Sequence, residues 1–308
     1  MSRVVVVGSF NVDHVWTTAM LPRPGETLGG RYATGPGGKG FNQAVACARS
    51  GARTTFICAL GDDPGGQLAR ALAADDGIDL RDLHSTEPTG TAGIYVDAEG
   101  RNSIVIGAGA NAALSAGHVD AQLESPTEAI AAALLTARAR GAIALLNPAP
   151  ANAPTTRDLL ALADVTTPNE TEFAGLVSRH VGERLDGDAV ASLDQPHLHA
   201  LCRDLLPAGT VVVTLGASGC FVSHADDALR GDDRAFYRLG AEQVRVVDST
   251  GAGDAFNGAI AAAMAGAPDA AFAGHLRFAS RYAALSTERE GAALAMPRRE
   301  EVAARFGG

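Results

Sequence analysis

Short runs of β-branched and other apolar residues alternate along the chain with longer stretches rich in Ala and Leu. The short runs are bounded by Gly and polar turn residues, which predicts strands, and the longer stretches predict helices. The predicted strands are 3–9, 53–61, 142–150, 164–173 and 210–216, and the predicted helices are 41–52, 65–77, 126–141, 157–163, 198–209 and an Ala-rich stretch after residue 254. This alternation predicts an α/β protein with a mostly parallel sheet covered by helices on both faces.

Polar and Gly-rich clusters follow the predicted strands: "GSFNVD", "LGDD", "NPAPA", "TPNETE", "TLGASG" and "DSTGAGD". In open parallel sheets, ligands bind beyond the carboxyl ends of the strands. The functional site is therefore expected at that edge of the sheet.

Two regions, 13–37 and 88–107, depart from the alternation. They have the pattern of hairpins, with turn residues at "PRPGE" and "DAEGR". Both begin or end at a polar cluster. This favours the interpretation that they form a small separate sheet acting as a lid, rather than two unrelated hairpins on the surface. The remaining parts, 1–12, 38–87 and 108–308, would form the α/β core.

The composition narrows the class of function. The chain has 308 residues and a formal net charge of −10, so it has no general positive field for nucleic acid or an anionic membrane. A small anionic ligand would need local hydrogen-bond donors.

The four cysteines lie in apolar runs without metal-like spacing. No apolar run reaches membrane-spanning length, and the first apolar run has the pattern of a strand rather than a signal segment. We therefore expect a cytoplasmic protein.

The stretch "DSTGAGDAFNGA" (248–259) is the most specific motif. Gly251, Ala252 and Gly253 open a predicted helix, and their N–H groups can converge on an anion. Asp254 follows directly, where it could take a proton from an attacking hydroxyl. The alternative is an ordinary acidic residue in the first turn of a helix. Few helices place it directly behind such a run of small residues, which favours a catalytic base.

The stretch "GPGGKGFNQA" (35–44) matches the G-x-G-x-x-G pattern, but its glycines come too late after the first strand for a dinucleotide fingerprint. It is not a phosphate-binding Walker loop, because Gly follows Lys39 where that motif has Ser or Thr. Lys39 and Asn42 lie at the predicted start of a helix, where their side chains could donate hydrogen bonds to hydroxyl groups of a ligand. This favours a ligand site. A loop that is merely Gly-rich is the alternative.

Two further clusters carry weaker signals. Asn169, Glu170 and Glu172 in "TPNETE" suit Mg²⁺ held mainly through water and phosphates, although an acidic helix N-terminus is about as good an explanation. The stretch "TLGASGC" (214–220) is a strand followed by a Gly turn, which suits a flat base lying over backbone.

Together these motifs resemble those of the ribokinase-like sugar kinases, also called the PfkB family. Its two signatures occur in order, as "GGKGFNQAVACARSGARTTFICALGDD" and "DSTGAGDAFNGA", and the likeness covers nearly the whole chain. Within the family it is strongest to members that phosphorylate ribose, through "GSFNVDH", "PRPGET", "GAGANAALS", "LESP", "NPAPA" and "TPNETE". The resemblance implies a three-layer sandwich with a small β-sheet lid, and a homodimer formed through that lid.

The resemblance also implies an activity, the phosphorylation of the 5-hydroxyl of D-ribose by ATP with Mg²⁺. Asp254 would be the base and residues 251–253 the anion hole. The implied sugar-binding residues are Asp13, Gly38, Lys39, Asn42, Asn111, Glu124 and Asp254, and the implied residues for the nucleotide, its phosphates and magnesium are Asn169, Glu172, Thr214, Gly216 and Gly219.

A monovalent cation site, usually for K⁺, is a further implication of the resemblance. Asp248 and Thr250 match one side of it, and Ser286, Arg289 and Gly291 could offer carbonyl groups on the other. A hydroxyl that is common in the family falls at Ala295, which has no side-chain oxygen, so the site is expected in altered form.

The segment 109–126 departs from the family pattern. Only "AGHVDAQ" lies between "GANAALS" and "LESP", where a helix and a core strand are expected. Either the sheet loses a strand or the chain lacks a segment, and Glu124 could be displaced.

Three other hypotheses stay open at this stage. The chain could be a family kinase for another sugar or a nucleoside, or a nucleotide-binding homologue that no longer catalyses. An NAD-dependent oxidoreductase is the third, but the late glycines and the Gly-Ala-Gly-Asp motif argue against it.

Overall fold

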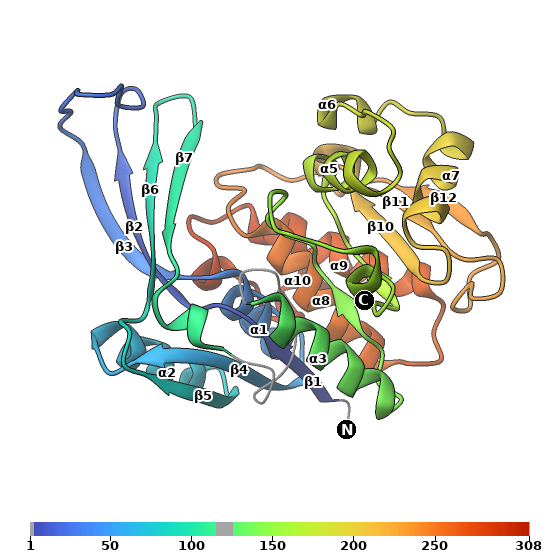
Figure 1. Ribbon diagram of the computed structural model, residues 1–308, viewed down its shortest axis with the longest axis horizontal. Helices are drawn as coiled ribbons and strands as arrows, with labels where there is room; N and C mark the ends of the chain where they lie inside the picture. Colours follow the sequence, from blue (N-terminus) through green and yellow to red (C-terminus); the bar gives the residue numbers. More distant parts are fainter. Residues whose placement is uncertain (1–2, 115–125, 308) are drawn as a thin grey trace.

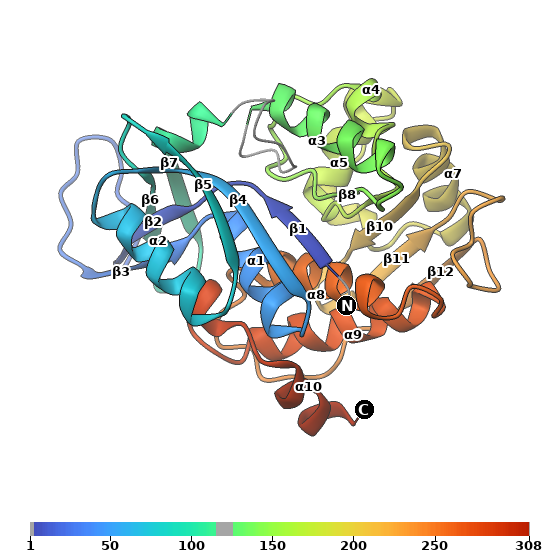
Figure 2. The same ribbon diagram turned by 90° about the horizontal axis from the view of Figure 1, so that it is seen from below.

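The computed structural model describes residues 3–114 and 126–307. Three β-sheets organise this part of the chain, and helices pack around two of them (Figures 1 and 2). The first sheet is parallel, with strand order β1-β4-β5. Its strands are β1 (Arg3–Val7), β4 (Arg53–Gly61) and β5 (Asp79–Ser85), linked by α1 (Lys39–Arg49) and α2 (Pro64–Asp75).

The second sheet has the order β12-β11-β10-β9-β8, with β8, β9 and β10 parallel and the other two antiparallel. Its strands are β8 (Leu145–Leu146), β9 (Val165–Thr166), β10 (Thr210–Thr214), β11 (Cys220–Ser223) and β12 (Phe236–Leu239). The helices and turns between them are α3 (Thr127–Ala139), α4 (Arg157–Leu160), α5 (Glu170–His180), α6 (Gly187–Val190), α7 (Gln195–Leu205) and η2 (Gly216–Ser218).

Side chains alternate across the sheets and bury two main cores. Val212 of β10 packs with residues of α1, α8 (Ala252–Gly266) and α9 (Phe272–Ser286). Its neighbours Val211 and Val213 pack on the opposite face, with residues of α3, α5 and α7. The sheet thus lies between two helical layers, as expected, because apolar strands are buried on both faces. The chain ends with η3 (Ala293–Ala295) and α10 (Arg299–Phe306).

The third sheet stands apart from the first two sheets, which belong to the core (Figure 1). It joins two hairpins, β2 (Asn11–Thr17) with β3 (Arg31–Gly37) and β6 (Gly90–Val96) with β7 (Asn102–Gly107), through parallel pairing of β2 with β6. Both predicted turns form, since Glu26 N–H donates to the carbonyl of Arg23 and Asp97 N–H to that of Arg101. We call this sheet the β2–β7 sheet.

The parallel sheet is divided between β1 and β8, which are edge strands of separate sheets within the described residues. For the shortened segment 109–126, the sequence leaves open whether the sheet loses a strand or the chain lacks a segment, and residues 115–125 of it lie outside the described residues. The strand predicted at 142–150 is only two residues long, Leu145–Leu146. Among the described strands it pairs with β9 alone, so it has a partner on one side only. No helix among the described residues is long and apolar enough to cross a membrane.

Candidate active site

The N-terminus of α8 carries the most specific motif of the sequence. Gly251 is its N-cap and has φ 76°, a left-handed conformation that favours glycine. Ala252 and Gly253 begin the helix, and Asp254 lies buried in its first turn. Of these N–H groups, that of Ala252 donates to the carbonyl of Ser249 at 3.1 Å, whereas that of Gly253 has no protein acceptor among the described residues.

Two neighbouring amides of α1 hold the Asp254 carboxylate. Nδ2 of Asn42 donates to one carboxylate oxygen and Nε2 of Gln43 to the other, each at 2.9 Å. Both amide side chains are buried. Oδ1 of Asn42 has no partner among the described residues, so it can accept a hydrogen bond from a ligand hydroxyl. A carboxylate held at both oxygens has one orientation, which a proton acceptor in catalysis needs.

Gly38 precedes α1 and lies against the connection between β1 and β2. It has φ 88°, and a Cβ here would lie 2.7 Å from the carbonyl oxygen of Ser9. The N–H of Phe41 donates to the same carbonyl at 3.0 Å, which fixes the start of the helix. Lys39 is the first residue of α1. The predicted sugar residues Gly38, Lys39 and Asn42 are thereby brought together with Asp254.

Asp13 of β2 lies beside the same helix start. A Cβ on Gly37 would fall 2.1 Å from its carboxylate, so the side chain packs directly over Gly37. The structure thus brings Asp13 next to the Gly38–Lys39 corner, on the side of the β2–β7 sheet.

Asn111, in η1 (Gly109–Ala113), is buried and is hydrogen-bonded to the turn after β1. Its amide bonds the backbone N–H and carbonyl of Phe10, each at 3.1 Å, and donates to Oδ1 of Asn11 at 2.9 Å. These contacts make it a clamp on the turn after β1. Glu124, the remaining predicted sugar residue, lies outside the described residues.

Four buried polar residues, Gln43, Asn147, Thr167 and Asn257, connect the two halves of the site and were not predicted. Gln43 Nε2 lies 3.3 Å from Oδ1 of Asn147, whose own amide donates to the carbonyl of Thr167. Thr167 donates to Asn257, which donates in turn to the carbonyl of Gly253. The polar clusters "NPAPA" and "TPNETE" were the available signal for Asn147 and Thr167. We call these residues with Asn42 and Asp254 the Asp254 network.

Asn169 and Glu172 form a capping box at the start of α5. Asn169 Oδ1 accepts from the N–H of Glu172 at 2.8 Å, and a Glu172 carboxylate oxygen accepts from the N–H of Asn169 at 2.9 Å. Burial raises the pKa of Glu172, the nearby Asp254 raises it further, and Lys39 acts against this shift. The pair therefore lies close to Asp254, although helix capping accounts for one oxygen of each side chain.

A cavity of about 320 Å³ lies beside the α8 N-terminus. Thr214, Gly216 and Gly219, predicted from the strand and Gly turn, form one side of it, and Ala252 and Gly253 form another. Its other walls are Ala217, residues 241–244, Val246, Ser249, Phe256, Ser280, Ala283, Ala284 and Thr287. The lining is largely small and apolar, as a flat aromatic base would require.

The loops predicted to hold a monovalent cation lie side by side behind the α8 N-terminus. The Asp248 carboxylate accepts from the N–H groups of Thr250 and Gly291, both at 2.9 Å. The carbonyl of Ser286 accepts from Arg289 N–H at 3.4 Å, and Arg289 also pairs with Glu301 through its side chain. The five predicted residues are brought together, and Ala295 is buried nearby.

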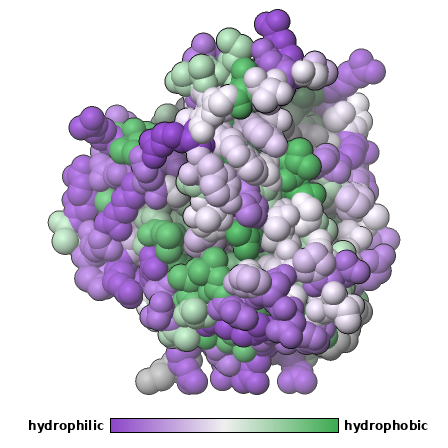
Figure 3. All heavy atoms as spheres, turned by 90° about the vertical axis from the view of Figure 1, so that its left-hand side faces the viewer, coloured by the Kyte–Doolittle hydropathy of each residue, from purple (hydrophilic) through white to green (hydrophobic). Residues whose placement is uncertain are grey.

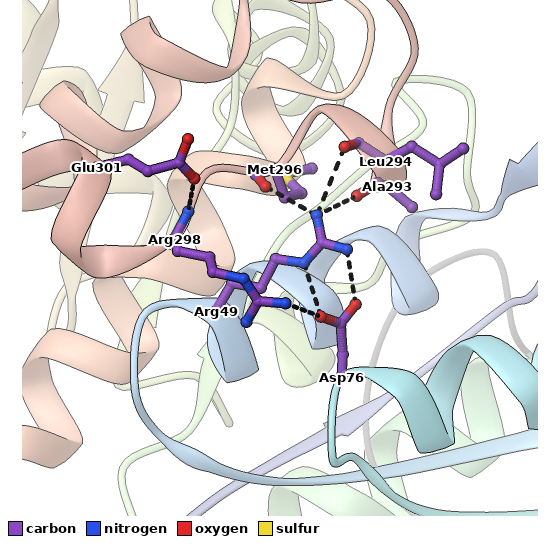
Figure 4. A network of polar contacts seen from close by, with 7 residues as sticks. All are labelled: Arg49, Asp76, Ala293, Leu294, Met296, Arg298 and Glu301. Atoms are coloured by element: carbon purple, nitrogen blue, oxygen red, sulfur yellow. Dashed lines mark hydrogen bonds and ion pairs between the residues drawn. The ribbon is translucent and has the colours of Figure 1, made fainter.

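A network around Arg49 supports the loop behind Gly251 (Figure 4). Arg49 makes a bidentate ion pair with the buried carboxylate of Asp76 at 2.8 and 2.9 Å, and donates to the carbonyl of Met296 at 2.8 Å. A Cβ on Gly251 would meet Ala292 at 2.9 Å and the Met296 side chain at 3.6 Å. The network thus ties α1 and α2 to the loop that packs against the α8 N-terminus.

Within residues 3–114 and 126–307, no three His, Cys, Asp or Glu side chains are grouped closely enough to hold a metal ion. The described part therefore contains no dedicated metal cage. The carboxylate and amide oxygens near Asp254 fit Mg²⁺ only as partial ligands, with water and phosphate oxygens as the others.

Comparison with known proteins decides the family. Residues 1–299 match the pfkB family carbohydrate kinases. The chain belongs to this family. A ribokinase from Haemophilus influenzae is 36% identical, with 97% of this chain and 96% of that protein covered. Two solved structures, ribokinase from Thermotoga maritima (TM-score 0.83, 30% identity, covering all of both chains) and Arabidopsis thaliana ribokinase complexed with ribose and ATP (TM-score 0.80, 30% identity, covering 98% and 97%), share the fold.

A carbohydrate kinase must hold a sugar and a phosphate donor side by side. In this pfkB family member, Asn42 at the start of α1 bonds the Asp254 carboxylate, and Ala252 and Gly253, the two residues before Asp254, line the cavity. The arrangement of the two signatures around one carboxylate therefore suits the chemistry of the family.

Proposed function

We propose that the protein transfers the γ-phosphoryl group of ATP to the 5-hydroxyl of D-ribose. The observation that carries this proposal is the position of Asp254. Asn42 and Gln43 of α1 hold its carboxylate, and the residue before it, Gly253, lines the cavity. The ribokinase relatives support ribose as the sugar, and the Arabidopsis structure contains both ribose and ATP.

Asp254 is the proposed base. Its two oxygens each accept one amide hydrogen bond, which leaves lone pairs for the proton of the sugar hydroxyl. As the hydroxyl oxygen attacks phosphorus, its proton moves to Asp254 and the bond to the leaving ADP oxygen breaks. Asn42 Oδ1, without a partner among the described residues, accepts from a second sugar hydroxyl and so orients the ring. Asp13, Gly38 and Lys39 complete the proposed sugar corner, with Asn111 as its support.

The α8 N-terminus is the proposed anion hole. Gly251, Ala252 and Gly253 place backbone close to the transferred group, and the N–H of Gly253 is available to it. The partial positive charge of a helix N-terminus adds to this effect. Phosphoryl transfer depends mainly on position and charge stabilisation, which these groups supply.

The cavity of about 320 Å³ is the proposed nucleotide site, with Thr214, Gly216 and Gly219 beside the base or ribose of ATP. Asn169 and the outer oxygen of Glu172 would hold waters of a Mg²⁺ ion, which when bound neutralises charge on the phosphates. Asp248, Thr250, Ser286, Arg289 and Gly291 would surround K⁺, which when bound adds positive charge behind the anion hole.

The β2–β7 sheet is the proposed lid and dimer interface. Every residue of β7 is exposed, including Ile104, Val105 and Ile106. On the side of the molecule that carries this sheet, apolar and near-neutral side chains gather between hydrophilic borders (Figure 3). Exposed apolar strand surface of this kind commonly marks a protein interface. In the proposed domain division, the α/β core comprises residues 1–12, 38–87 and 108–308.

We also propose that the protein works in a reducing compartment such as the cytoplasm. Its four cysteines are free and buried, and burial raises the pKa of Cys47, Cys202 and Cys220 to about 12. Thiols of this kind neither pair nor react readily.

A coupled assay of ADP release tests the function. The panel contains D-ribose, 2-deoxy-D-ribose, other pentoses and hexoses, and nucleosides, each with ATP and Mg²⁺, with and without K⁺. Turnover of D-ribose with the highest kcat/KM is the expected result. Turnover of another sugar or a nucleoside alone would replace the substrate, and no turnover with intact ATP binding would indicate a non-catalytic homologue.

A further inference from the structure

A second cavity, of about 480 Å³, lies between the two halves of the divided sheet. Residues 3–7 of β1 form one wall and residues 142–145, up to the start of β8, form the other. Helix α8 closes one face with Gly258, Ala261 and Met264, and α3 closes the opposite face with Ala133, Leu134 and Ala137. Two apolar side chains at the walls remain open to solvent, with Val5 43% and Ile143 52% exposed. We call this cavity the strand slot.

Both walls of the strand slot present backbone groups without sheet partners among the described residues. The N–H of Gly8 donates to the carbonyl of Ile57 in β4, so the N–H and C=O of Val5 and Val7 point to the opposite edge, into the slot. The carbonyl of Leu146 accepts from Thr167 N–H beside β9, so the backbone groups of Leu145 likewise face the slot. Open strand edges in a largely apolar groove can accept another strand, because main-chain hydrogen bonds and apolar packing then favour the same occupant.

The two walls run in the same direction. At the carboxyl end of β1, Ser9 accepts a hydrogen bond from the start of α1, and at the carboxyl end of β8, Asn147 accepts one from Gln43 of the same helix. The slot therefore has two parallel strand edges and helices on both faces. This is the environment of a central strand in a parallel sheet, which is apolar on both sides.

We propose that the strand slot binds one extended apolar peptide segment, which adds as a parallel strand between β1 and β8. Main-chain hydrogen bonds to Val5, Val7 and Leu145 would hold the segment, and its side chains would pack on α3 and α8. The cavity volume falls within the range of built ligand sites. An apolar segment fits best, because most lining side chains are apolar, although the lining also includes Arg3, Gln43, Thr136, Arg140 and Asn257.

The strand slot is also connected to the proposed base. Gln43 and Asn257 line the slot, and both belong to the Asp254 network. A bound segment would restrict the Gln43 side chain, which holds one oxygen of Asp254. This coupling rests on the proposed function, whereas binding of the segment does not.

Fluorescence anisotropy with a synthetic peptide tests the proposal on the full chain. The probe is a labelled, end-blocked peptide of alternating Val and Leu with Lys pairs at both ends, and the control peptide has the same residues with N-methyl groups at alternate positions. The expected result is saturable binding of the first peptide, a rise of a few degrees in the midpoint of thermal unfolding, and no binding of the methylated peptide. With ribose and ATP saturating, kcat should rise by about fivefold.

Two variants locate the binding. Val5→Pro removes a donor that faces the slot and keeps the ladder to β4, so it should weaken binding by about tenfold, as expected for one lost hydrogen bond. Ala261→Phe fills the slot from α8 and should abolish binding, which keeps the test decisive if the proline variant does not fold. Equal binding of both peptides, or full binding by the variants, would overturn the proposal.

The remaining outcomes are equally decisive. A dimer whose formation removes peptide binding, and which Ala261→Phe dissociates, would make a second copy the occupant and overturn the peptide proposal. Binding with unchanged kcat would overturn the coupling to Asp254. A protein that turns over no sugar would count against the proposed function, while the anisotropy measurement would still decide on the slot.

Discussion

Gln43 donates its side-chain amide to Asp254 at 2.9 Å from a position 211 residues away in the chain. The same nitrogen lies 3.3 Å from Oδ1 of Asn147. Gln43 therefore links the proposed base, Asp254 on α8, to Asn147, which follows β8.

Replacement of Gln43 by Leu should lower kcat by up to about 100-fold, because a loosely held carboxylate samples unproductive orientations. The KM for ATP should stay unchanged, since Gln43 does not line the cavity beside Gly253. Steady-state kinetics with the exposed Gln67→Leu as the matched control measures this effect. An equal loss in both variants would show that Gln43 has no positioning role.

Asp254→Asn should reduce kcat by several orders of magnitude, of which proton abstraction accounts for about 10²–10⁴-fold. The amide is nearly isosteric, so the hydrogen-bonded network should persist in altered form and ATP should still bind. Single-turnover kinetics and isothermal titration separate the two effects. Asp269→Asn changes an exposed carboxylate and is the control. Near-normal turnover of Asp254→Asn would remove Asp254 from the role of base.

The β2–β7 sheet should form a dimer in solution. Val105 of β7 is 66% exposed, and Val105→Glu should shift multi-angle light scattering from the mass of a dimer to that of a monomer, because like charges would meet at the interface. Leu135→Glu places the same charge on an equally apolar but separate surface, on α3, and should leave the dimer intact. A wild-type monomer at assay concentration would argue against the interface.

Stability should fall in mild acid partly because of His224. Its pKa is lowered, mainly by burial, whereas the bond to Asp232 acts in the opposite direction. The native state therefore holds this imidazole neutral, while the unfolded state takes up a proton below its own pKa of about 6.5. The stabilising contribution is complete above that pH and is lost as pH falls from there toward the folded-state pKa.

Urea unfolding between pH 7.5 and 5 measures this contribution. The loss of unfolding free energy over that range should be smaller in His224→Gln than in the wild type, whatever the absolute stability of the variant. His84 is exposed, and His84→Gln should reproduce the wild-type pH dependence. Parallel curves for the wild type and His224→Gln would contradict the assignment.

The sequence predicts local features of the site well, since each depends on neighbouring residues. The helix that opens at residues 251–253 and the turns at "PRPGE" and "DAEGR" were predicted from residue type alone. The short segment 109–126 indicates an interrupted crossover, and among the described residues β1 and β8 are edge strands of separate sheets. Long-range pairing is different: nothing near Asn147 in the sequence indicates that it meets Gln43, since the fold alone brings them together.

Some polar residues suit two roles equally well, and their sequence context does not distinguish the roles. Asn169 and Glu172 were equally suited to capping a helix and to serving magnesium, and they do cap α5, because the first N–H groups of a helix need acceptors. Asn111 is predicted to bind the sugar, and its amide also bonds the backbone of Phe10. A short amide side chain satisfies backbone or ligand equally well, so only the surrounding fold distinguishes the two.

Arg49 and Asp76 form the ion pair on which the loop behind Gly251 depends. Their side chains are 17% and 6% exposed. Among the described residues, Arg49→Ala would leave the buried Asp76 carboxylate with only Arg298, 3.6 Å away, as an ion-pair partner, and the carbonyl of Met296 would lose its donor. The free energy of unfolding should fall by about 3 kcal/mol, as expected when one member of a buried pair is removed.

Arg49→Lys should recover only part of this loss, because an ammonium group cannot bind both oxygens of Asp76 and the carbonyl of Met296 in one plane. Arg81 provides the matched control, since it pairs with Asp79 on the surface, with both side chains more than half exposed. Arg81→Ala should cost less than about 1 kcal/mol. Chemical denaturation of the three variants gives the comparison, and equal losses for Arg49→Ala and Arg81→Ala would show that the buried network does not hold the loop.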